Sequence, residues 1–260
     1  CALPIFPFRL LSLTAISGEF PTSQLNRLPA SPYYLEAVVT ALKKAGLLRT
    51  YYRDRLRGYR LGAKAKLVLL DGWPERFTFC LTGDAETNRL KSEANRRFRL
   101  HRLAETYITM GNAGVLLYPD EKPKVFAQTG FGGEAVTYPV FYSSREVKEL
   151  GADATQIRSS RFAGVLLVPT GIFVTYNSGG ALMKWRYKSE LRVKTLLWNI
   201  LCQQRLAQQY RVEQVHGLVL GDSMDLAYQI LTSTGGAKHD YFMLDGSYDH
   251  FYFLTNDHQG

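Results

Sequence analysis

The stretch SPYYLEAVVTALKKAGLLRTYYRDRLRGYRLG (Ser31–Gly62) decides how the first part of this chain folds. Its first half has Ser31 as a helix cap and Pro32 at the first helical position, and it ends at Gly46, a residue type that commonly stops helices. Between them, apolar side chains recur every three or four positions: Leu35, Val38, Val39 and Leu42. This spacing predicts an amphipathic helix over residues 31–46.

A strongly basic hairpin is expected directly after this helix. The segments LLRTYY (47–52) and GYRL (58–61) are rich in Tyr and Leu and predict two short strands. Basic side chains crowd around Gly58, with only Asp54 opposing them: Arg53, Arg55, Arg57, Arg60, Lys64 and Lys66. A charge cluster of this kind either meets a polyanion or is an ordinary solvated hairpin.

Two further helices are expected upstream of Ser31. PFRLLSLTAISG (7–18) carries apolar residues at helical spacing and ends at Gly18, whereas PTSQLNRLPA (21–30) allows only a short helix before Pro29. The predicted order is therefore helix, helix, helix, strand, basic turn, strand. A short helix followed by a tight turn and a longer helix is the helix-turn-helix arrangement.

On the patterns LTAISGEFPTSQLNRL, YYLEAVVTALKKAGLL and DRLRGYRLG, residues 8–66 resemble the winged-helix DNA-binding superfamily. The resemblance implies that the helix over 31–46 lies in the major groove and that the hairpin is a wing whose arginines reach phosphates or the minor groove. The DNA-binding residues expected on this basis are Ser31, Tyr33, Tyr34, Lys43, Lys44, Arg53, Arg55, Arg57, Arg60 and Lys64.

The distribution of charge agrees with a polyanion-binding surface in the first part of the chain. The 260 residues carry a formal net charge of +9, with 32 Lys and Arg against 23 Asp and Glu. Residues 1–110 contain 18 of these basic and 9 of these acidic residues, so the remainder of the chain is balanced. This asymmetry favours nucleic acid as the partner of the amino-terminal part.

Three segments are predicted: a DNA-binding domain over 1–70, a connection over 71–110, and a second domain over 111–260. The connection is expected to contain a strand, RFTFCLTG (76–83), and a long helix over 85–111 with a basic face. The second domain alternates strand-like runs with helical patterns, which predicts an α/β domain with a mixed sheet and an α+β fold for the whole chain. Its expected strands and helices are AGVLLYP, KVFAQTG, TYPVFYSS, FAGVLLVPTGIFVTYNSG, ALMKWRY, a helix over 189–210, HGLVLGD, a helix in SMDLAYQILTS, YFMLDG and HFYFLTN.

The segment RFAGVLLVPTGIFVTYNSGGALMKWRYKSELRVKTLLW (161–198) resembles the core of PD-(D/E)xK nucleases, which bind magnesium through carboxylates on adjacent strands. The positions where those carboxylates would fall hold Ala163 and the VTYN run over 174–177. The resemblance therefore implies a degenerate core with no catalytic residues, metal or cofactor, and the protein is not expected to be an enzyme.

Together with the winged-helix pattern, this layout resembles the plasmid replication-relaxation family and accessory proteins of conjugative and mobile elements. The resemblance implies a double-stranded DNA-binding protein that acts in replication, conjugative transfer or their transcriptional control. A homodimer and docking of replication or transfer proteins are the further partners that it suggests.

Two other functions remain open on the sequence. A metal-dependent nuclease could draw its site from residues near 184–190, 222–225 and 245–250, namely Lys184, Lys188, Glu190, Asp222, Asp225, Asp245, Asp249 and His250. Magnesium-dependent cleavage of supercoiled plasmid separates this hypothesis from the others. A protein-interaction module with a basic face would show no saturable duplex binding at physiological salt.

The sequence also predicts where the protein resides. No apolar run approaches the roughly 18 to 20 residues of a membrane helix. The three cysteines, Cys1, Cys80 and Cys202, are far apart and form no CxxC pair, which argues against a zinc site or a disulfide framework. A soluble protein in the reducing cytoplasm, with no membrane partner, is expected.

Overall fold

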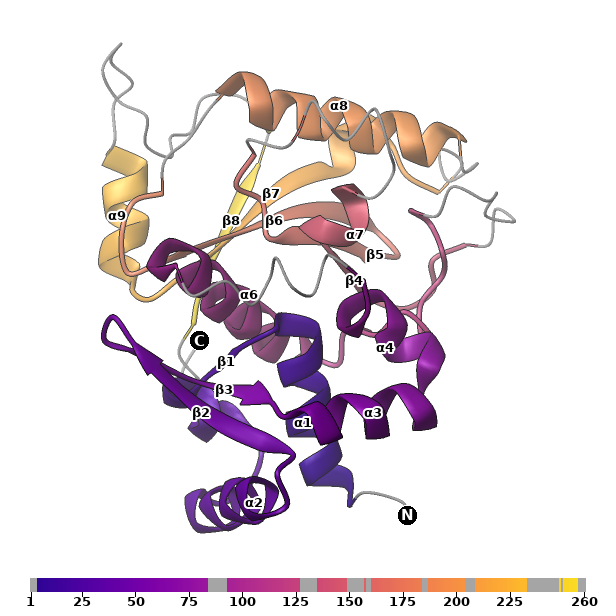
Figure 1. Cartoon of the computed structure of the whole chain (residues 1–260). Helices are drawn as coiled ribbons and strands as arrows, with labels where there is room; N and C mark the ends of the chain where they lie inside the picture. The colour runs from indigo at the N-terminus through magenta and orange to yellow at the C-terminus, as the bar shows by residue number, and fades with distance from the viewer. Residues whose placement is uncertain are drawn as a thin grey trace. The chain divides into compact units, whose positions relative to one another are not determined.

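The computed structural model describes residues 4–83, 93–126, 135–148, 157, 160–183, 187–203, 209–232, 248 and 250–256. The chain divides into two compact units. The first comprises Cys1–Ala113 with Tyr118–Asp120, and the second comprises Gly114–Leu117 with Glu121–Gly260. Both units mix helices and strands, which confirms the expected α+β class (Figure 1).

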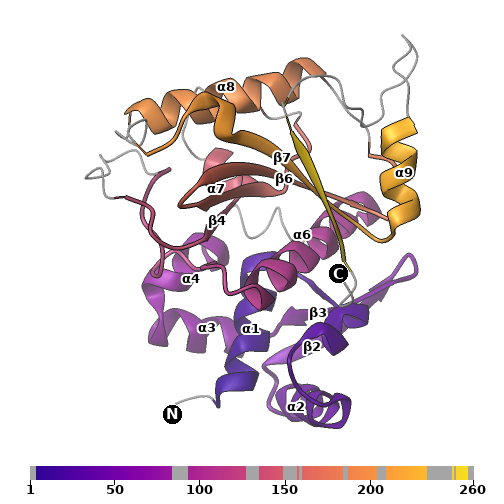
Figure 2. The same cartoon turned by 180° about the vertical axis from the view of Figure 1, so that it is seen from behind.

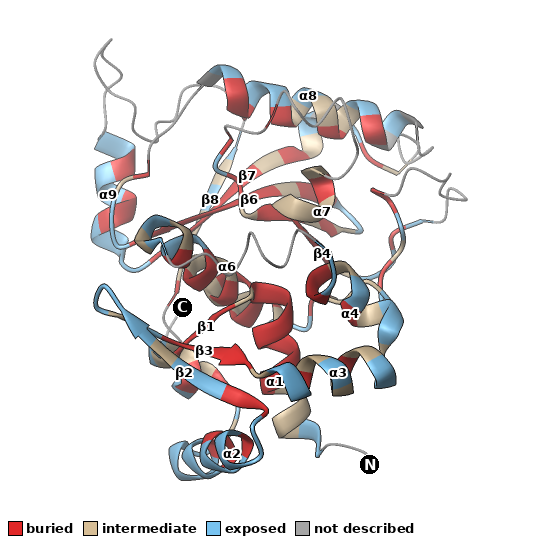
Figure 3. Ribbon diagram, in the orientation of Figure 1, coloured by how far each residue is buried: buried red, intermediate tan, exposed pale blue. Residues whose placement is uncertain are grey.

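The first unit combines helices with a small antiparallel sheet of order β1-β3-β2. Its elements are α1 (Ile5–Ser17), β1 (Phe20–Pro21), the 3-10 helix η1 (Thr22–Arg27), α2 (Pro32–Lys44), β2 (Leu48–Arg53), β3 (Leu56–Leu61), α3 (Ala63–Gly72), α4 (Pro74–Leu81) and α6 (Ala94–Asn112). Helix α1 is buried from Leu10 to Ser17, so it forms the centre of this unit (Figure 3). The helices predicted over 7–18, 21–30 and 31–46 and the hairpin after them are confirmed.

The strand predicted over 76–83 is wrong, because this segment forms helix α4. Pro74 occupies the first turn, and the buried side chains Phe77, Cys80 and Leu81 follow the spacing of a helix face. Helix α3 was not predicted either, and it places Lys64 on a helix and not on the hairpin.

The second unit is built on a mixed sheet, which Figure 2 shows from behind. Its strand order is β4-β5-β6-β7-β8. Its elements are β4 (Val140–Ser143), α7 (Ser144–Lys148), β5 (Gly164–Val168), β6 (Gly171–Gly179), α8 (Tyr187–Gln203), η4 (Val212–Gln214), β7 (Val215–Gly221), α9 (Met224–Thr232) and β8 (Phe251–Thr255). Strands β4, β5 and β6 run antiparallel, and β6, β7 and β8 run parallel. The predicted mixed sheet is confirmed.

One face of this sheet carries the core of the second unit. Side chains from alternate positions of the strands, such as Val165 and Val174, pack with Val193 and Leu197 of α8 and with Leu226 of α9. Because β6 joins β7 through α8, and α9 lies between β7 and β8 in the chain, the two helices cover the parallel part of the sheet.

Several expected strands of the second unit are absent from its described residues. Segment 113–119 contributes only an isolated bridge between Leu116 and Val140, and residues 124–126 and 181–183 are not in strands. Short apolar runs also suit buried loops, which is why their pattern misled the prediction. Residues 127–130, 184–186 and 241–246 lie outside the described residues.

Candidate nucleic-acid interface

Helix α2 is fixed at both ends by the residues that predicted it. The Ser31 side chain accepts a hydrogen bond from the Tyr34 backbone N–H (3.3 Å), so Ser31 acts as the helix cap. At the other end, Gly46 has a φ of 71° and donates to the Lys43 carbonyl, while Leu47 N–H donates to the Leu42 carbonyl. This Schellman motif needs a left-handed residue, which explains Gly46.

The exposed face of α2 carries the tyrosines and lysines named from the sequence. Tyr33 is 84% exposed and Tyr34 is 43% exposed, with the Tyr34 ring edge-on to Phe6. Lys43 and Lys44 are also exposed, and the Lys43 ammonium lies 5.3 Å from the centre of the Tyr59 ring. These side chains are available to a ligand, whereas Leu35, Val38, Val39 and Leu42 pack inward.

The tip of the β2–β3 hairpin presents three exposed arginines, Arg53, Arg55 and Arg57. Arg53 and Leu56 pair across a two-residue turn, and both turn residues have positive φ, 52° for Asp54 and 61° for Arg55. This is the conformation of a type I′ turn, which favours Asn, Asp and Gly. Asp54 suits it, but an arginine there is held in a region that its side chain disfavours.

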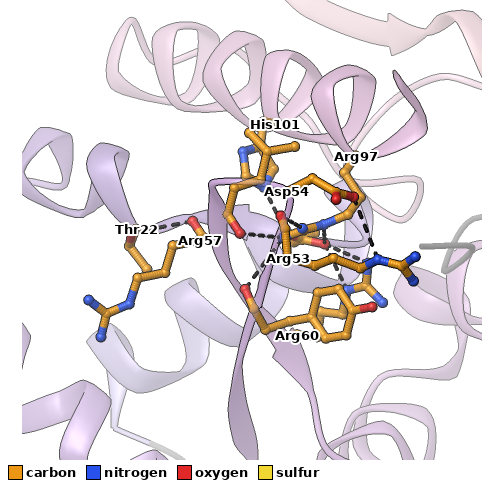
Figure 4. Close-up of polar contacts among 10 residues, drawn as sticks. Thr22, Arg53, Asp54, Arg57, Arg60, Arg97 and His101 are labelled. Atoms are coloured by element: carbon orange, nitrogen blue, oxygen red, sulfur yellow. Dashed lines mark hydrogen bonds and ion pairs between the residues drawn. The ribbon is translucent and has the colours of Figure 1, made fainter. Parts of the chain in front are cut away.

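Arg60 does not belong to this exposed set, although the sequence placed it there. Its side chain is buried, and it donates from Nε to Glu19 Oε2 (2.7 Å). The same carboxylate accepts from Arg97 of α6 and lies 2.8 Å from His101 Nε2 (Figure 4). We call Glu19, Arg60, Arg97 and His101 the Glu19 cluster. The cluster joins β3 to α6, and the buried guanidinium of Arg60 is not available to a ligand at the surface.

Arg97 also ties the hairpin to α6. Its guanidinium donates to the carbonyl oxygens of Arg53 (2.6 Å) and Tyr51 (3.4 Å) on β2 and of Leu56 (2.9 Å) on β3. The Tyr51 ring lies beside both buried guanidinium groups, 4.0 Å from Arg60 and 4.6 Å from Arg97. The outer half of the hairpin is thus held by Arg97 and by a hydrogen bond from Thr22 Oγ1 to the Arg57 carbonyl (3.3 Å), in addition to its own ladder.

Burial of Glu19 would by itself raise the pKa of its carboxyl. Hydrogen bonds from His101, Arg97 and Arg60 outweigh that effect and lower the pKa from 4.5 to about 2. Glu19 is therefore a carboxylate throughout the neutral range, and it neutralises positive charge that the sequence had assigned to the surface.

The remaining predicted residue of this interface, Lys64, is exposed on α3. Sequence reasoning missed Glu19 and Arg97 as a pair, because they are separated by 78 positions and Arg97 stands among other arginines on a helix expected to have a basic face. The only signal for Glu19 was an isolated acidic residue between a helix stop and Pro21.

The second unit does not assemble the alternative nuclease site among its described residues. Ala163 precedes β5, and β5 and β6 contain no carboxylate. Glu190 is buried and accepts hydrogen bonds from Ser160 Oγ, Arg161 N–H (3.1 Å) and Tyr176 OH (2.9 Å). Burial raises its pKa, although these bonds act against the rise. Glu190 is thus part of the core.

The other candidates of that site do not gather around Glu190. Lys188 is exposed on α8, and Asp225 is exposed on α9. Asp222 accepts from Asn256 Nδ2 (3.2 Å), and His250 is exposed just before β8. Lys184, Asp245 and Asp249 lie outside the described residues. Within the described part of the chain, no group of three or more His, Cys, Asp or Glu could hold a metal ion.

In the ranges that the structure describes, no helix has the length and apolar character needed to cross a membrane. The chain was also compared with models of known protein families, with curated proteins and with solved structures, and none of them matches it.

Proposed function

We propose that the first unit binds double-stranded DNA through α2 and the β2–β3 hairpin, as a winged helix does. The element order α1, η1, α2, β2, β3 supports this proposal, because it is the order of a helix-turn-helix followed by a wing. In this arrangement α2 enters the major groove with Tyr33, Tyr34, Lys43 and Lys44, and the hairpin contacts the sugar-phosphate backbone.

The observation that carries the proposal is the division of the hairpin's arginines. Arg60 is neutralised by Glu19 inside the unit, whereas Arg53, Arg55 and Arg57 remain exposed around the turn. A hairpin that was merely solvated would gain nothing from an arginine at φ 61°. A contact with phosphate would explain why an arginine occupies this position of the turn. Guanidinium groups bind phosphate oxygens in a bidentate manner.

For the second unit we propose a catalytically silent relative of the PD-(D/E)xK core. Three antiparallel strands, β4 to β6, are followed by α8 and the parallel strand β7, and the positions where that core needs metal-binding carboxylates hold Ala163 and the VTYN run over 174–177. The resemblance to replication-relaxation proteins extends the proposal to replication or transfer of a plasmid or other mobile element, or to transcriptional control of these processes.

The test measures binding of the protein to a random 30-base-pair DNA duplex. Fluorescence anisotropy reports the affinity at each concentration of a salt series. The double variant Arg55→Ala/Arg57→Ala is expected to bind more weakly and to lower the log-log salt slope by about 0.9 for each lost phosphate contact, about 1.8 in total. The matched control is Lys188→Ala/Arg192→Ala, which removes the same charge from exposed positions of α8. Equal slopes for the two double variants would refute a contact between hairpin and phosphate.

A single substitution at the turn is expected to change stability and binding in opposite directions. Arg55→Gly relieves the left-handed conformation, so the free energy of unfolding is expected to rise by up to about 1 kcal/mol. The same variant is expected to bind duplex more weakly, with a salt slope lower by about 0.9. Denaturant unfolding and anisotropy on the same preparation check both signs. Unchanged binding together with higher stability would show that Arg55 contacts no phosphate.

A further inference from the structure

Strand β8 leaves one edge of the five-stranded sheet open in the described part of the chain. It pairs with β7 alone, at the end of the strand order. Gly217 N–H donates to the His250 carbonyl (2.9 Å), and Asn256 N–H donates to the Gly221 carbonyl (2.7 Å). Even-numbered residues of the strand therefore direct their backbone groups to β7. The backbone groups of Phe253 and Thr255 point to the opposite side, towards the open edge.

Within its described residues, strand β8 carries none of the sequence features that usually prevent strand pairing. The sequence FYFLT contains no charged residue, no proline and no glycine, and the register with β7 shows no bulge. Natural edge strands normally carry a lysine, a proline or a bulge for protection. On the face away from the core, Tyr252 is 48% exposed and Leu254 is 49% exposed. An apolar strand with open backbone groups is suited to receive another extended strand.

Helix α9, which follows β7 in the chain, also carries exposed apolar side chains. Its buried side chains Leu226 and Ile230 belong to the core, and the helix contacts β7. On its opposite side, Met224, Tyr228 and Leu231 form a stripe at helical spacing, each of them 66% to 68% exposed. The stripe is a second exposed apolar surface of this unit.

The near absence of charged side chains on β8 and α9 distinguishes between nucleic acid and protein as the partner of this surface. Neither β8 nor α9 contains a lysine or an arginine, and Asp225 is the one charged residue in the two elements. Phosphate groups would find no cation on these elements, so nucleic acid is a poor fit. Self-contact at the hairpin would bring arginines against arginines, whereas self-contact over residues 251–255 of β8 opposes no like charges.

We propose that β8 pairs with β8 of a second copy of this chain, antiparallel and about a two-fold axis perpendicular to the sheet. With Phe253 opposite Phe253 of the second copy, Tyr252 of each chain lies beside Leu254 of the other. Such aromatic–aliphatic cross-strand pairs stabilise sheets. An axis in this direction keeps α9 of both copies on the same side of the joined sheet, and a two-fold contact closes the assembly as a dimer.

The test is the solution mass of the full chain without DNA, measured by sedimentation equilibrium across a dilution series. The wild-type protein is expected at twice the chain mass of 29.4 kDa. Thr255→Pro removes a backbone N–H that faces the open edge and leaves the bonds to β7 intact, so this variant is expected at the mass of one chain. Leu254→Lys introduces an edge lysine on a half-exposed side chain and is expected to have the same effect.

The matched control is Leu67→Lys, which alters an apolar side chain of similar type, 69% exposed, on α3 of the first unit. It is expected to stay dimeric. A monomeric wild-type protein, or a dimer that survives Leu254→Lys, overturns the proposal. If Thr255→Pro fails to fold, Leu254→Lys alone tests whether β8 forms the dimer contact. Because no DNA is present, the result is independent of the DNA-binding proposal.

Discussion

Replacing Glu19 with alanine is expected to lower the free energy of unfolding by about 3 to 5 kcal/mol, the largest stability change of any substitution discussed here. The carboxylate is fully buried and accepts hydrogen bonds from Arg60 and Arg97, which are themselves buried. Its removal leaves two guanidinium groups inside the unit with no opposite charge. Chemical denaturation at neutral pH measures the change.

The matched control for this prediction is Glu36→Ala, which removes an exposed carboxylate from α2. Its effect is expected to stay within about 0.5 kcal/mol, as is usual for surface positions. If Glu19→Ala and Glu36→Ala unfolded at the same denaturant concentration, the Glu19 cluster would have no net stabilising role.

The pH dependence of stability gives an independent measure of the same cluster. The folded-state pKa of Glu19, about 2, lies below its ordinary value of 4.5. A lowered pKa contributes stability above pH 4.5, and this contribution is lost as the pH falls from 4.5 towards 2. The difference between the two pKa values corresponds to about 3 kcal/mol. Glu19→Gln is therefore expected to show a flatter acid limb in a series of unfolding curves than the wild-type protein.

Local sequence patterns were sufficient to predict much of the first unit. Ser31, Pro32 and Gly46 each perform at the ends of α2 the role that their residue types suggested. Such signals depend on hydrogen bonds between residues a few positions apart, so they can be read without knowing the fold. The segment over 76–83 was misread because Phe77, Cys80 and Leu81 satisfy a helix, while the run as a whole also resembles a strand.

The candidate interface was predictable only in part, because burial of charge depends on distant partners. Arg53, Arg57 and Arg60 look alike in the sequence, yet only Arg60 meets Glu19. The pairing follows from the register of β3 with β1, which places Phe20 opposite Tyr59. Glu19 directly precedes Phe20, and Arg60 directly follows Tyr59. No local pattern encodes that register. Charge counting therefore overestimated the number of arginines at the surface.

Arg97→Lys is expected to weaken DNA binding although Arg97 itself is buried. Lysine keeps the positive charge beside Glu19, but a single ammonium cannot reproduce the planar guanidinium that reaches Arg53, Tyr51 and Leu56 together. A bond between a charged donor and a carbonyl contributes about 1.5 to 3 kcal/mol, so the loss of one such bond is enough to release the outer hairpin. The outer hairpin is then released from α6 while the helices of the unit stay folded.

Two measurements separate this positioning role from a general loss of stability. Amide hydrogen exchange is expected to become faster over residues 51–57 of the variant and to stay unchanged in α2. Apparent DNA affinity falls in proportion to the fraction of molecules with a docked hairpin, so a hairpin docked one tenth of the time binds about tenfold more weakly. Because the exposed arginines are all retained, the salt slope is expected to match the wild-type value, in contrast to Arg55→Ala/Arg57→Ala. Full affinity despite faster exchange in the hairpin would mean that DNA is bound through α2 alone.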